Sequence, residues 1–181
     1  MRIVEAETAA GPEPATFDAF FRREHPRLVA LAVMLTGDLR LAEDLAQEAL
    51  LRAYRDWDRI REYDLPAAWV RRVLLNLATS AGRRGQRERR ALALVPTPDT
   101  DPSRAEDDGL CGDGPRFWAA VRALPRRQAE VIALFYVEDL SVSQIAVVLA
   151  CAEGTVKSHL HRGRAALAVS LRSFVDEEKV P

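Results

Sequence analysis

Hydrophobic positions recur every three to four residues along two long stretches of the chain, which is the pattern of helices that bury one side. The alternation of apolar and polar residues that marks strands is nearly absent, and no turn signal joins two β-rich runs. The sequence therefore predicts an all-α protein. The expected helices cover residues 17–24, 26–36, 38–60, 66–83, 115–123, 125–137, 141–149 and 153–173.

Local signals mark several helix ends. Pro26 suits the first turn of a helix, Gly37 is a usual stop, and Asp38 can cap the helix that follows. Ser141 and Gln144 have the spacing of a capping box, in which each side chain bonds the other residue's backbone N–H. We therefore expect a helix to begin directly after Ser141.

The segment between the two helical stretches has a different composition. Residues 91–115 hold one Arg, six acidic residues, four Pro and three Gly, with little apolar periodicity. Such a composition is typical of a flexible linker, so we expect two small helical domains joined by a tether. The expected parts are an N-terminal tail (1–16), a first domain (17–90), an acidic linker (91–114), a second domain (115–173) and a C-terminal tail (174–181).

Charge is distributed unevenly, although 26 basic and 27 acidic residues leave a net charge of only −1. Residues 17–90 and residues 116–175 each carry a net +4, whereas residues 91–115 carry −5. The overall balance argues against a strongly basic nucleic-acid binder and against a highly charged disordered chain.

Targeting and redox signals are also absent from the sequence. No apolar run approaches the roughly 20 residues that span a bilayer, and the acidic N-terminus lacks the apolar core of a signal peptide. Cys111 and Cys151 are too few to build a disulfide framework. We expect a cytoplasmic protein that does not insert into a membrane.

A polar stripe lies opposite the apolar side of the expected helix 38–60, when residues are placed at about 100° each. The apolar side carries Leu41, Ala42, Leu45, Ala49 and Ala53. The polar stripe carries Asp44, Gln47, Glu48, Leu51 and Arg55. Acidic residues near a helix N-terminus are typical of a solvated surface, where the helix dipole favours them, and they also suit docking of a basic partner. Both interpretations stay open at this point.

A second polar row lies on the expected helix 66–83. It consists of Arg72, Asn76, Thr79 and Arg83, with Trp69 at its edge. Guanidinium, amide and hydroxyl groups in one row suit contacts with phosphates and base edges. An indole can stack on an unpaired base, although Trp69 taken alone fits a half-buried packing position equally well.

The last two expected helices have the plan of a helix-turn-helix unit. Residues 140–149 and 153–167 flank a tight turn at 150–152. Val156, Leu160, Gly163 and Leu167 share the inner face of the second helix, where we expect them to pack on the first helix, with Gly163 permitting close approach. The outer face suits the major groove of DNA. It carries Thr155, Lys157, Ser158, His161, Arg162 and Arg164.

Together these segments resemble the bacterial sigma-70 family, and specifically its small two-domain extracytoplasmic-function (ECF) group. The resemblance is carried by residues 35–48, 68–84, 124–132 and 140–167. Residues 35–48 resemble the docking helix of sigma domain two, and residues 68–84 resemble the helix of that domain that melts the promoter and reads the −10 element. Residues 124–132 resemble the start of sigma domain four, and residues 140–167 resemble the helix-turn-helix of that domain, which reads the −35 element. The four segments stand in the family's order around an acidic linker.

The resemblance implies a non-enzymatic factor that binds core RNA polymerase and directs promoter recognition, DNA melting and transcription initiation. The implied core-binding residues are Asp44, Gln47, Glu48 and Leu51. The implied −10 residues are Trp69, Arg72, Asn76, Thr79 and Arg83. The implied −35 residues are Thr155, Lys157, Ser158, His161, Arg162 and Arg164.

The resemblance also implies the partners of such a factor. Core polymerase would bind through its β′ coiled coil and its β flap, and promoter DNA would bind both domains. An anti-sigma factor is a further candidate partner. No membrane insertion, small-molecule substrate or cofactor is expected.

Two other classes of protein compete with this interpretation. A LuxR-like regulator also uses a helix-turn-helix, but it leaves the acidic stripe with Asp44 and Glu48 without a role. A helical metalloenzyme is disfavoured because no Glu-x-x-His pair completes a di-iron site, and because His159 and His161 do not have the i, i+4 spacing of ligands on one helical face. The sequence predicts no enzyme and no metal.

Overall fold

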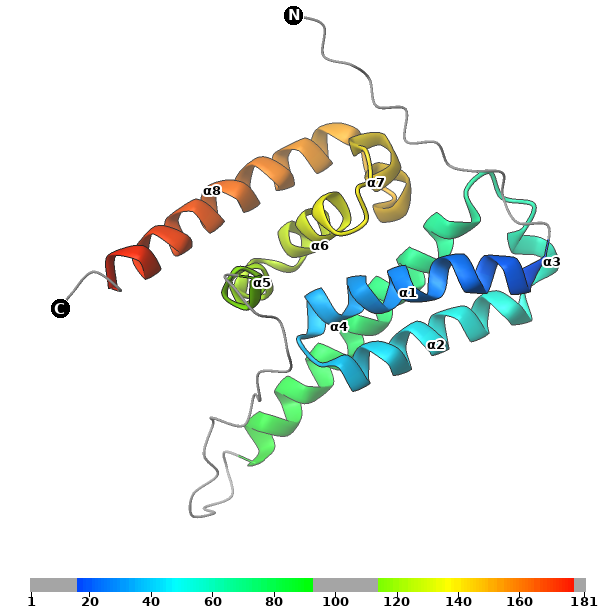
Figure 1. Ribbon diagram of the computed structural model, residues 1–181, viewed down its shortest axis with the longest axis horizontal. Coiled ribbons are helices and arrows are strands. Elements are labelled where there is room, and N and C mark those ends of the chain that lie inside the picture. The colour runs from blue at the N-terminus through cyan, green and yellow to red at the C-terminus, as the bar shows by residue number, and fades with distance from the viewer. Residues whose placement is uncertain (1–15, 93–113, 178–181) are drawn as a thin grey trace, which may run out of the picture.

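The computed structural model describes residues 16–92 and 114–177, and every regular element within these ranges is an α-helix (Figure 1). The all-α prediction is confirmed. The helices are α1 (Phe17–Thr36), α2 (Leu39–Arg55), α3 (Trp57–Ile60), α4 (Pro66–Leu92), α5 (Gly114–Ala123), α6 (Arg126–Tyr136), α7 (Val142–Leu149) and α8 (Glu153–Glu177).

Helices α1 to α4 form one unit, in which α1 packs along α2 and both pack on α4. Its core is built from aliphatic and aromatic side chains at helical spacing, which supply the apolar burial that stabilises a small domain. The largest fully buried apolar side chains of this unit are Phe20, Leu28, Leu31, Leu50, Ile60, Leu74 and Val70.

Helices α5 to α8 form the second unit, in which α5, α6 and α7 all contact α8. Val121, Ile132, Leu134, Ile145 and Val156 are each fully buried there. Each unit contributes buried apolar side chains, and together these side chains form one continuous apolar core.

Helix α1 differs from the prediction of two helices, 17–24 and 26–36. It runs without a break from Phe17 to Thr36 with Pro26 inside. Proline removes one backbone hydrogen bond and normally ends or kinks a helix. Here Pro26 is exposed while Glu24 and Leu28 on either side of it are buried, so tertiary packing holds both turns in one helix.

Three other helix ends also differ from the prediction. The expected helix 38–60 is divided at Asp56, whose backbone leaves the helical region, and Trp57 then starts the short α3. Helix α4 continues nine residues past Arg83, and α8 extends to Glu177. The segment added to α4 is rich in Arg, which favours helix where nothing stops it.

The predicted caps are present. The Asp38 side chain accepts a hydrogen bond from the Leu41 N–H at 3.0 Å, and Gly37 ends α1 in the left-handed conformation at φ 74°. Ser141 and Gln144 form both bonds of the capping box, at 3.2 and 2.8 Å.

The two helical units pack against each other. Helix α1 contacts α5 and α6, and α4 contacts α7, so that the second unit covers one side of the first (Figure 1). Among the helices described, none has both the length and the apolar character that crossing a bilayer requires.

Candidate functional site

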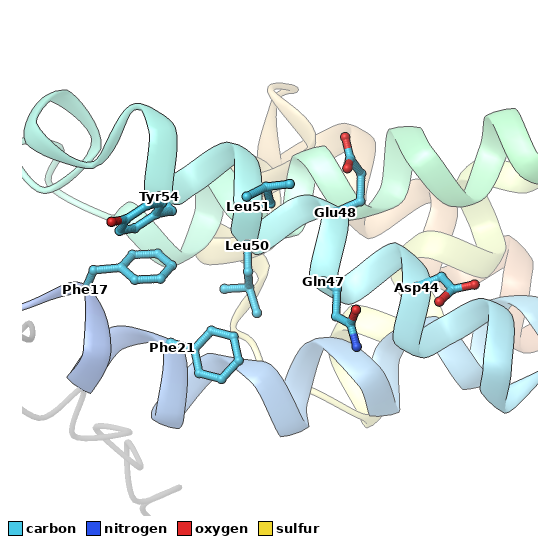
Figure 2. Close-up of a pocket in the computed structure, with 8 residues that line it drawn as sticks. All are labelled: Phe17, Phe21, Asp44, Gln47, Glu48, Leu50, Leu51 and Tyr54. Atoms are coloured by element: carbon cyan, nitrogen blue, oxygen red, sulfur yellow. The ribbon is translucent and has the colours of Figure 1, made fainter.

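A groove lies between α1 and α2, on the side of α2 that carries the polar stripe (Figure 2). It has a volume of about 560 Å³. We name it the acidic groove. Its lining residues are Phe17, Phe21, Asp44, Gln47, Glu48, Leu50, Leu51 and Tyr54.

The floor of the acidic groove is apolar and partly open to solvent. Tyr54 is 63% exposed, Leu51 42% and Phe21 36%, although side chains of this size are usually buried. Phe17 packs against two other rings at the end of the groove. Its ring centroid lies 5.0 Å from that of Tyr54 and 5.4 Å from that of Trp57. The rings therefore form one aromatic cluster at this end of the groove.

The rim of the acidic groove carries the charged residues expected from the sequence. Asp44 and Gln47 are exposed, and Asp44 has no ion pair among the described residues. Glu48 is paired with Arg52 at 2.8 Å, one turn further along α2. An apolar floor with an acidic rim suits a helix that presents apolar and basic side chains.

The sequence did not predict the aromatic part of this groove, which Phe17 and Phe21 of α1 and Tyr54 of α2 form. The pattern within one helix cannot show that two helices share a surface. The available signal is the pair of aromatic residues at a spacing of four, beside the buried Phe20.

The polar row on α4 is only partly accessible. Trp69 is half-buried against the core, and Thr79 is also half-buried, with its hydroxyl donating to the Leu75 carbonyl at 2.8 Å. Asn76 and Arg83 are exposed. The row is therefore present on one helix, but part of it faces the second unit.

Arg72 lies at the point where α4 meets α7. Its Nε donates to the Val148 carbonyl at 2.8 Å, and its Nη2 donates to the Val147 carbonyl. These carbonyls belong to the last turn of α7, where backbone acceptors lack partners within the helix. The guanidinium thus caps a helix of the other unit.

Arg71, next to Arg72, is buried and joins three segments. Its Nη1 lies 2.9 Å from Glu24 Oε2 in α1, and its Nε donates to Glu138 Oε2 at 2.9 Å in the turn between α6 and α7. The three side chains are at most 4% exposed. The sequence gives no sign of this role for Arg71, because neither acidic partner is near it in the chain.

The outer face of α8 is accessible. Thr155, Lys157, Ser158, His161 and Arg162 are all exposed, as the helix-turn-helix plan predicts. Lys157 makes a loose ion contact with Glu153 on this face, at 3.9 Å. The face therefore offers donors and a positive charge to a large groove.

Arg164 is held differently from the other residues of this face. Its Nε donates to the Tyr136 hydroxyl at 3.0 Å, and its guanidinium lies 5.0 Å from the Phe135 ring centroid. Contact with α6 fixes the direction of this side chain.

The inner face of α8 corrects one detail of the prediction. Val156, Leu160, Gly163 and Leu167 are buried as expected. However, Gly163 faces α6 and not α7: a Cβ there would meet Ile132 Cγ1 at 3.1 Å. The close approach that Gly163 permits is therefore between α8 and α6.

Other candidate chemistry is sparse. Across residues 16–92 and 114–177, no group of three or more His, Cys, Asp or Glu side chains could hold a metal ion. Cys151 is a free, partly buried thiol, and Cys111 lies outside the described residues.

Comparison with known families defines the class of protein. The family model for sigma-70 region 2 matches residues 20–88, and the model for sigma-70 region 4 matches residues 116–167. These ranges coincide with the two helical units, so α1 to α4 contain region 2 and α5 to α8 contain region 4.

Individual relatives narrow the class. The chain is 34% identical over 168 residues to the ECF RNA polymerase sigma factor SigL of Mycobacterium tuberculosis, covering 92% of this chain and 94% of SigL. It is 32% identical over 161 residues to the RNA polymerase sigma-E factor of Streptomyces avermitilis, covering 89% of this chain and 88% of that factor. The chain belongs to the ECF group of the sigma-70 family.

Solved structures agree with this assignment. The sigma factor RpoE of Bartonella quintana, in complex with the anti-sigma factor NepR, matches with a TM-score of 0.68 and 29% identity, over 86% of this chain and 96% of RpoE. CnrH, solved with the cytosolic domain of CnrY, matches with a TM-score of 0.63 over 87% of this chain and 88% of CnrH. At 22% identity, that second match shows the fold alone.

Family membership decides the general function. The chain directs RNA polymerase to promoters and takes part in transcription initiation, and it acts by binding and not by catalysis. The LuxR-like alternative is wrong, because such a regulator has no sigma-70 region 2.

Proposed function

We propose that the acidic groove binds the β′ coiled coil of core RNA polymerase. The observation that carries this proposal is the exposed apolar floor formed by Phe21, Leu51 and Tyr54, beside the acidic Asp44 and Glu48. An amphipathic helix with basic flanks would cover the aromatic floor and pair with the rim. The solvated-surface interpretation of the stripe does not explain an apolar floor that is open to solvent.

The two other faces are assigned to DNA. Trp69, Arg72, Asn76, Thr79 and Arg83 on α4 would engage the opened −10 strand, with phosphate contacts from the arginines and stacking on the indole. The exposed face of α8 would read the −35 element in the major groove. Its residues are Thr155, Lys157, Ser158, His161, Arg162 and Arg164.

Further partners and boundaries belong to the same proposal. The second domain would contact the β flap of the polymerase, and an anti-sigma factor would regulate the protein in the cytoplasm. The similarity to RpoE, which was solved with NepR, supports an anti-sigma partner. The proposed domains are residues 17–90 and 115–173, with the linker at 91–114.

Reversing the charge of the groove rim tests the core-binding assignment. Asp44→Arg combined with Glu48→Arg should abolish binding to purified core polymerase, because the basic partner would be repelled. Arg22→Ala, which removes an exposed ion pair with Asp18 on α1, is the matched control and should bind normally. Core binding is measured by fluorescence anisotropy, and helix content by circular dichroism. Normal core binding by a folded double variant would contradict the assignment.

A further inference from the structure

The last residue of α6, Tyr136, meets Arg164 of α8 on the surface of the second unit. The Arg164 Nε donates a hydrogen bond to the Tyr136 hydroxyl at 3.0 Å, across 28 positions of the chain. Both side chains are exposed, Tyr136 to 52%. Contact between exposed side chains buries little apolar surface, so this pair contributes little to the hydrophobic core. It lies instead where a ligand of this surface can reach it.

Two aromatic rings support the same guanidinium. The Arg164 Cζ lies 5.0 Å from the ring centroid of Phe135 and 5.6 Å from that of Tyr136. The two rings meet edge to face, with their centroids 5.1 Å apart and their planes at 74°. A guanidinium within about 6 Å of a ring centroid is attracted by the electrons of the ring face. One hydrogen bond and two ring contacts therefore restrict the rotamers of a side chain that is long and otherwise free to turn.

The contact with Tyr136 leaves most of the Arg164 donors unused. An arginine carries five N–H groups, and the one on Nε is the one that Tyr136 accepts. Within residues 16–92 and 114–177, the N–H groups on Nη1 and Nη2 have no hydrogen-bond acceptor. A guanidinium that is fixed at Nε and free at both Nη atoms presents donors in the planar fork that fits a phosphate.

Arg164 lies at the edge of the face of α8 that is assigned to DNA. Lys157, His161 and Arg164 follow one another at spacings of four and three, which places them on one side of a helix. Because Arg164 also reaches α6, it marks the margin of this face nearest that helix. A helix in the major groove reads base edges, and the contacts that fix its register go to the flanking phosphates. A position at the margin suits a phosphate contact.

We propose that Tyr136 is a positioning residue for promoter binding, because its hydroxyl and its ring aim the Arg164 guanidinium at a phosphate of the −35 duplex. Tyr136 acts through Arg164 and needs no contact of its own with DNA. An arginine that is already held in its bound conformation loses less conformational entropy when it binds, so the phosphate contact is strengthened. The inference rests on the proposed −35 role of α8 and adds a residue outside that helix.

Removal of one oxygen atom tests the positioning role. Tyr136→Phe deletes the hydroxyl and keeps the exposed ring, so the chain should stay folded. Holoenzyme is assembled from core polymerase and each variant, and its affinity is measured on promoter duplexes in which one −35 phosphate at a time is a neutral methylphosphonate. With the wild-type chain, one position should show a loss of about threefold to tenfold. That loss should be absent in Arg164→Ala and should fall below about twofold in Tyr136→Phe.

A double-mutant cycle on unmodified promoter DNA gives a second readout. Tyr136→Phe should lower holoenzyme affinity by about twofold to fivefold, and it should have no further effect in a chain that already carries Arg164→Ala. Tyr63→Phe is the matched control, since it removes the hydroxyl of an exposed tyrosine in the turn between α3 and α4, and it should leave the −35 phosphate pattern unchanged. A role in stability alone would lower the unfolding midpoint of Tyr136→Phe and would not change the phosphate pattern.

The outcomes separate the positioning role from the function on which it rests. A wild-type phosphate pattern in Tyr136→Phe, alongside a changed pattern in Arg164→Ala, would overturn the positioning role alone. Additive losses from the two substitutions would also overturn it, because Tyr136 would then act independently of Arg164. If Arg164→Ala keeps the affinity and the phosphate pattern of the wild-type chain, the assignment of Arg164 to the −35 duplex is wrong, and the inference is overturned with it.

Discussion

Ala150 is the residue with the clearest local strain. It ends α7 in the left-handed conformation, at φ 50° and ψ 52°, a region that residues with a Cβ rarely adopt. The turn to α8 requires this conformation, since the Ala150 N–H returns to carbonyls of the last turn of α7. The strain therefore belongs to the helix-turn-helix geometry and not to a contact.

Replacing Ala150 with Gly should stabilise the protein. Glycine removes the cost of about 1–2 kcal/mol that a Cβ incurs in the left-handed region. It also raises the conformational entropy of the unfolded chain, which costs about 0.4–1 kcal/mol. We therefore expect the free energy of unfolding to rise by roughly 0.5–1 kcal/mol. Denaturant unfolding followed by circular dichroism measures it. Ala166→Gly, at an exposed position inside α8, is the control and should destabilise by about 0.5–1 kcal/mol. A loss of stability at position 150 equal to that of the control would contradict the strain argument.

Arg162 and Arg164 should affect DNA binding in different ways. Arg162 is exposed, and no bond holds it within the described part of the chain, whereas Arg164 is fixed by Tyr136. Arg162→Ala should weaken binding of polymerase holoenzyme to its cognate −35 element by about 1–3 kcal/mol and relax the base preference. Arg164→Ala should weaken binding to all sequences alike, as loss of a phosphate contact does. Affinity over a library of −35 variants distinguishes the two, and equal loss of base preference in both variants would be evidence against the assignment.

At the scale of single helices, capping residues set some helix ends and tertiary packing sets others. Helix α7 has only eight residues, too few for stability from propensity alone, and its first turn depends on the capping box of Ser141 and Gln144. Helix α1 shows the opposite case, because it continues past Pro26 and is stabilised there by its buried side chains. A local cap thus sets the start of the short α7, whereas burial carries the long α1 past its proline.

Loss of the Ser141 cap should weaken the helix-turn-helix unit. Ser141→Ala leaves the Gln144 N–H without its side-chain acceptor and should cost about 1 kcal/mol in the free energy of unfolding. Ser80→Ala, which removes an exposed hydroxyl that bonds one turn back inside α4, is the control and should change stability by less than about 0.5 kcal/mol. The cap is unimportant if denaturant unfolding gives the same midpoint for both variants.

At the scale of the whole molecule, the balance of charge limits binding by the free factor. Each helical stretch carries a net +4, but the full chain carries −1. Electrostatic attraction to DNA is therefore weak overall, and Arg72 of α4 already donates a hydrogen bond to the Val148 carbonyl of α7. The polymerase has to supply both the alignment and the effective concentration.

Core polymerase should therefore raise the apparent affinity of this factor for promoter DNA by roughly 10²–10⁴-fold at fixed salt, the range expected when binding sites are linked. Fluorescence anisotropy with a labelled promoter duplex, with and without core polymerase, measures the ratio. The double variant Asp44→Ala and Leu51→Ala is the control, since it should lose the enhancement and keep the weak intrinsic binding. Tight, selective binding by the chain alone, unchanged by core polymerase, would contradict this account.

Much of the molecule was determined by the sequence alone. Helical periodicity, the caps at Asp38 and Ser141, the buried side of α8 and the division into two helical units all depend on residues close together in the chain. Short-range geometry is regular, so spacing is enough to predict which side of a helix is buried. The acidic residues of the groove rim and the exposed residues of α8 were found in this way.

Only the tertiary structure decided how these parts meet. Phe21 on α1 and Tyr54 on α2 line one groove because two helices pack side by side, and no spacing within either helix specifies that. Arg71 and Glu138 are separated by 67 positions, so their pairing has no local signature. Whether an arginine on α4 is solvated, buried or engaged by α7 depends on what covers that side of the helix, because burial and hydrogen-bond partners come from the assembled fold and not from the order of residues along the chain.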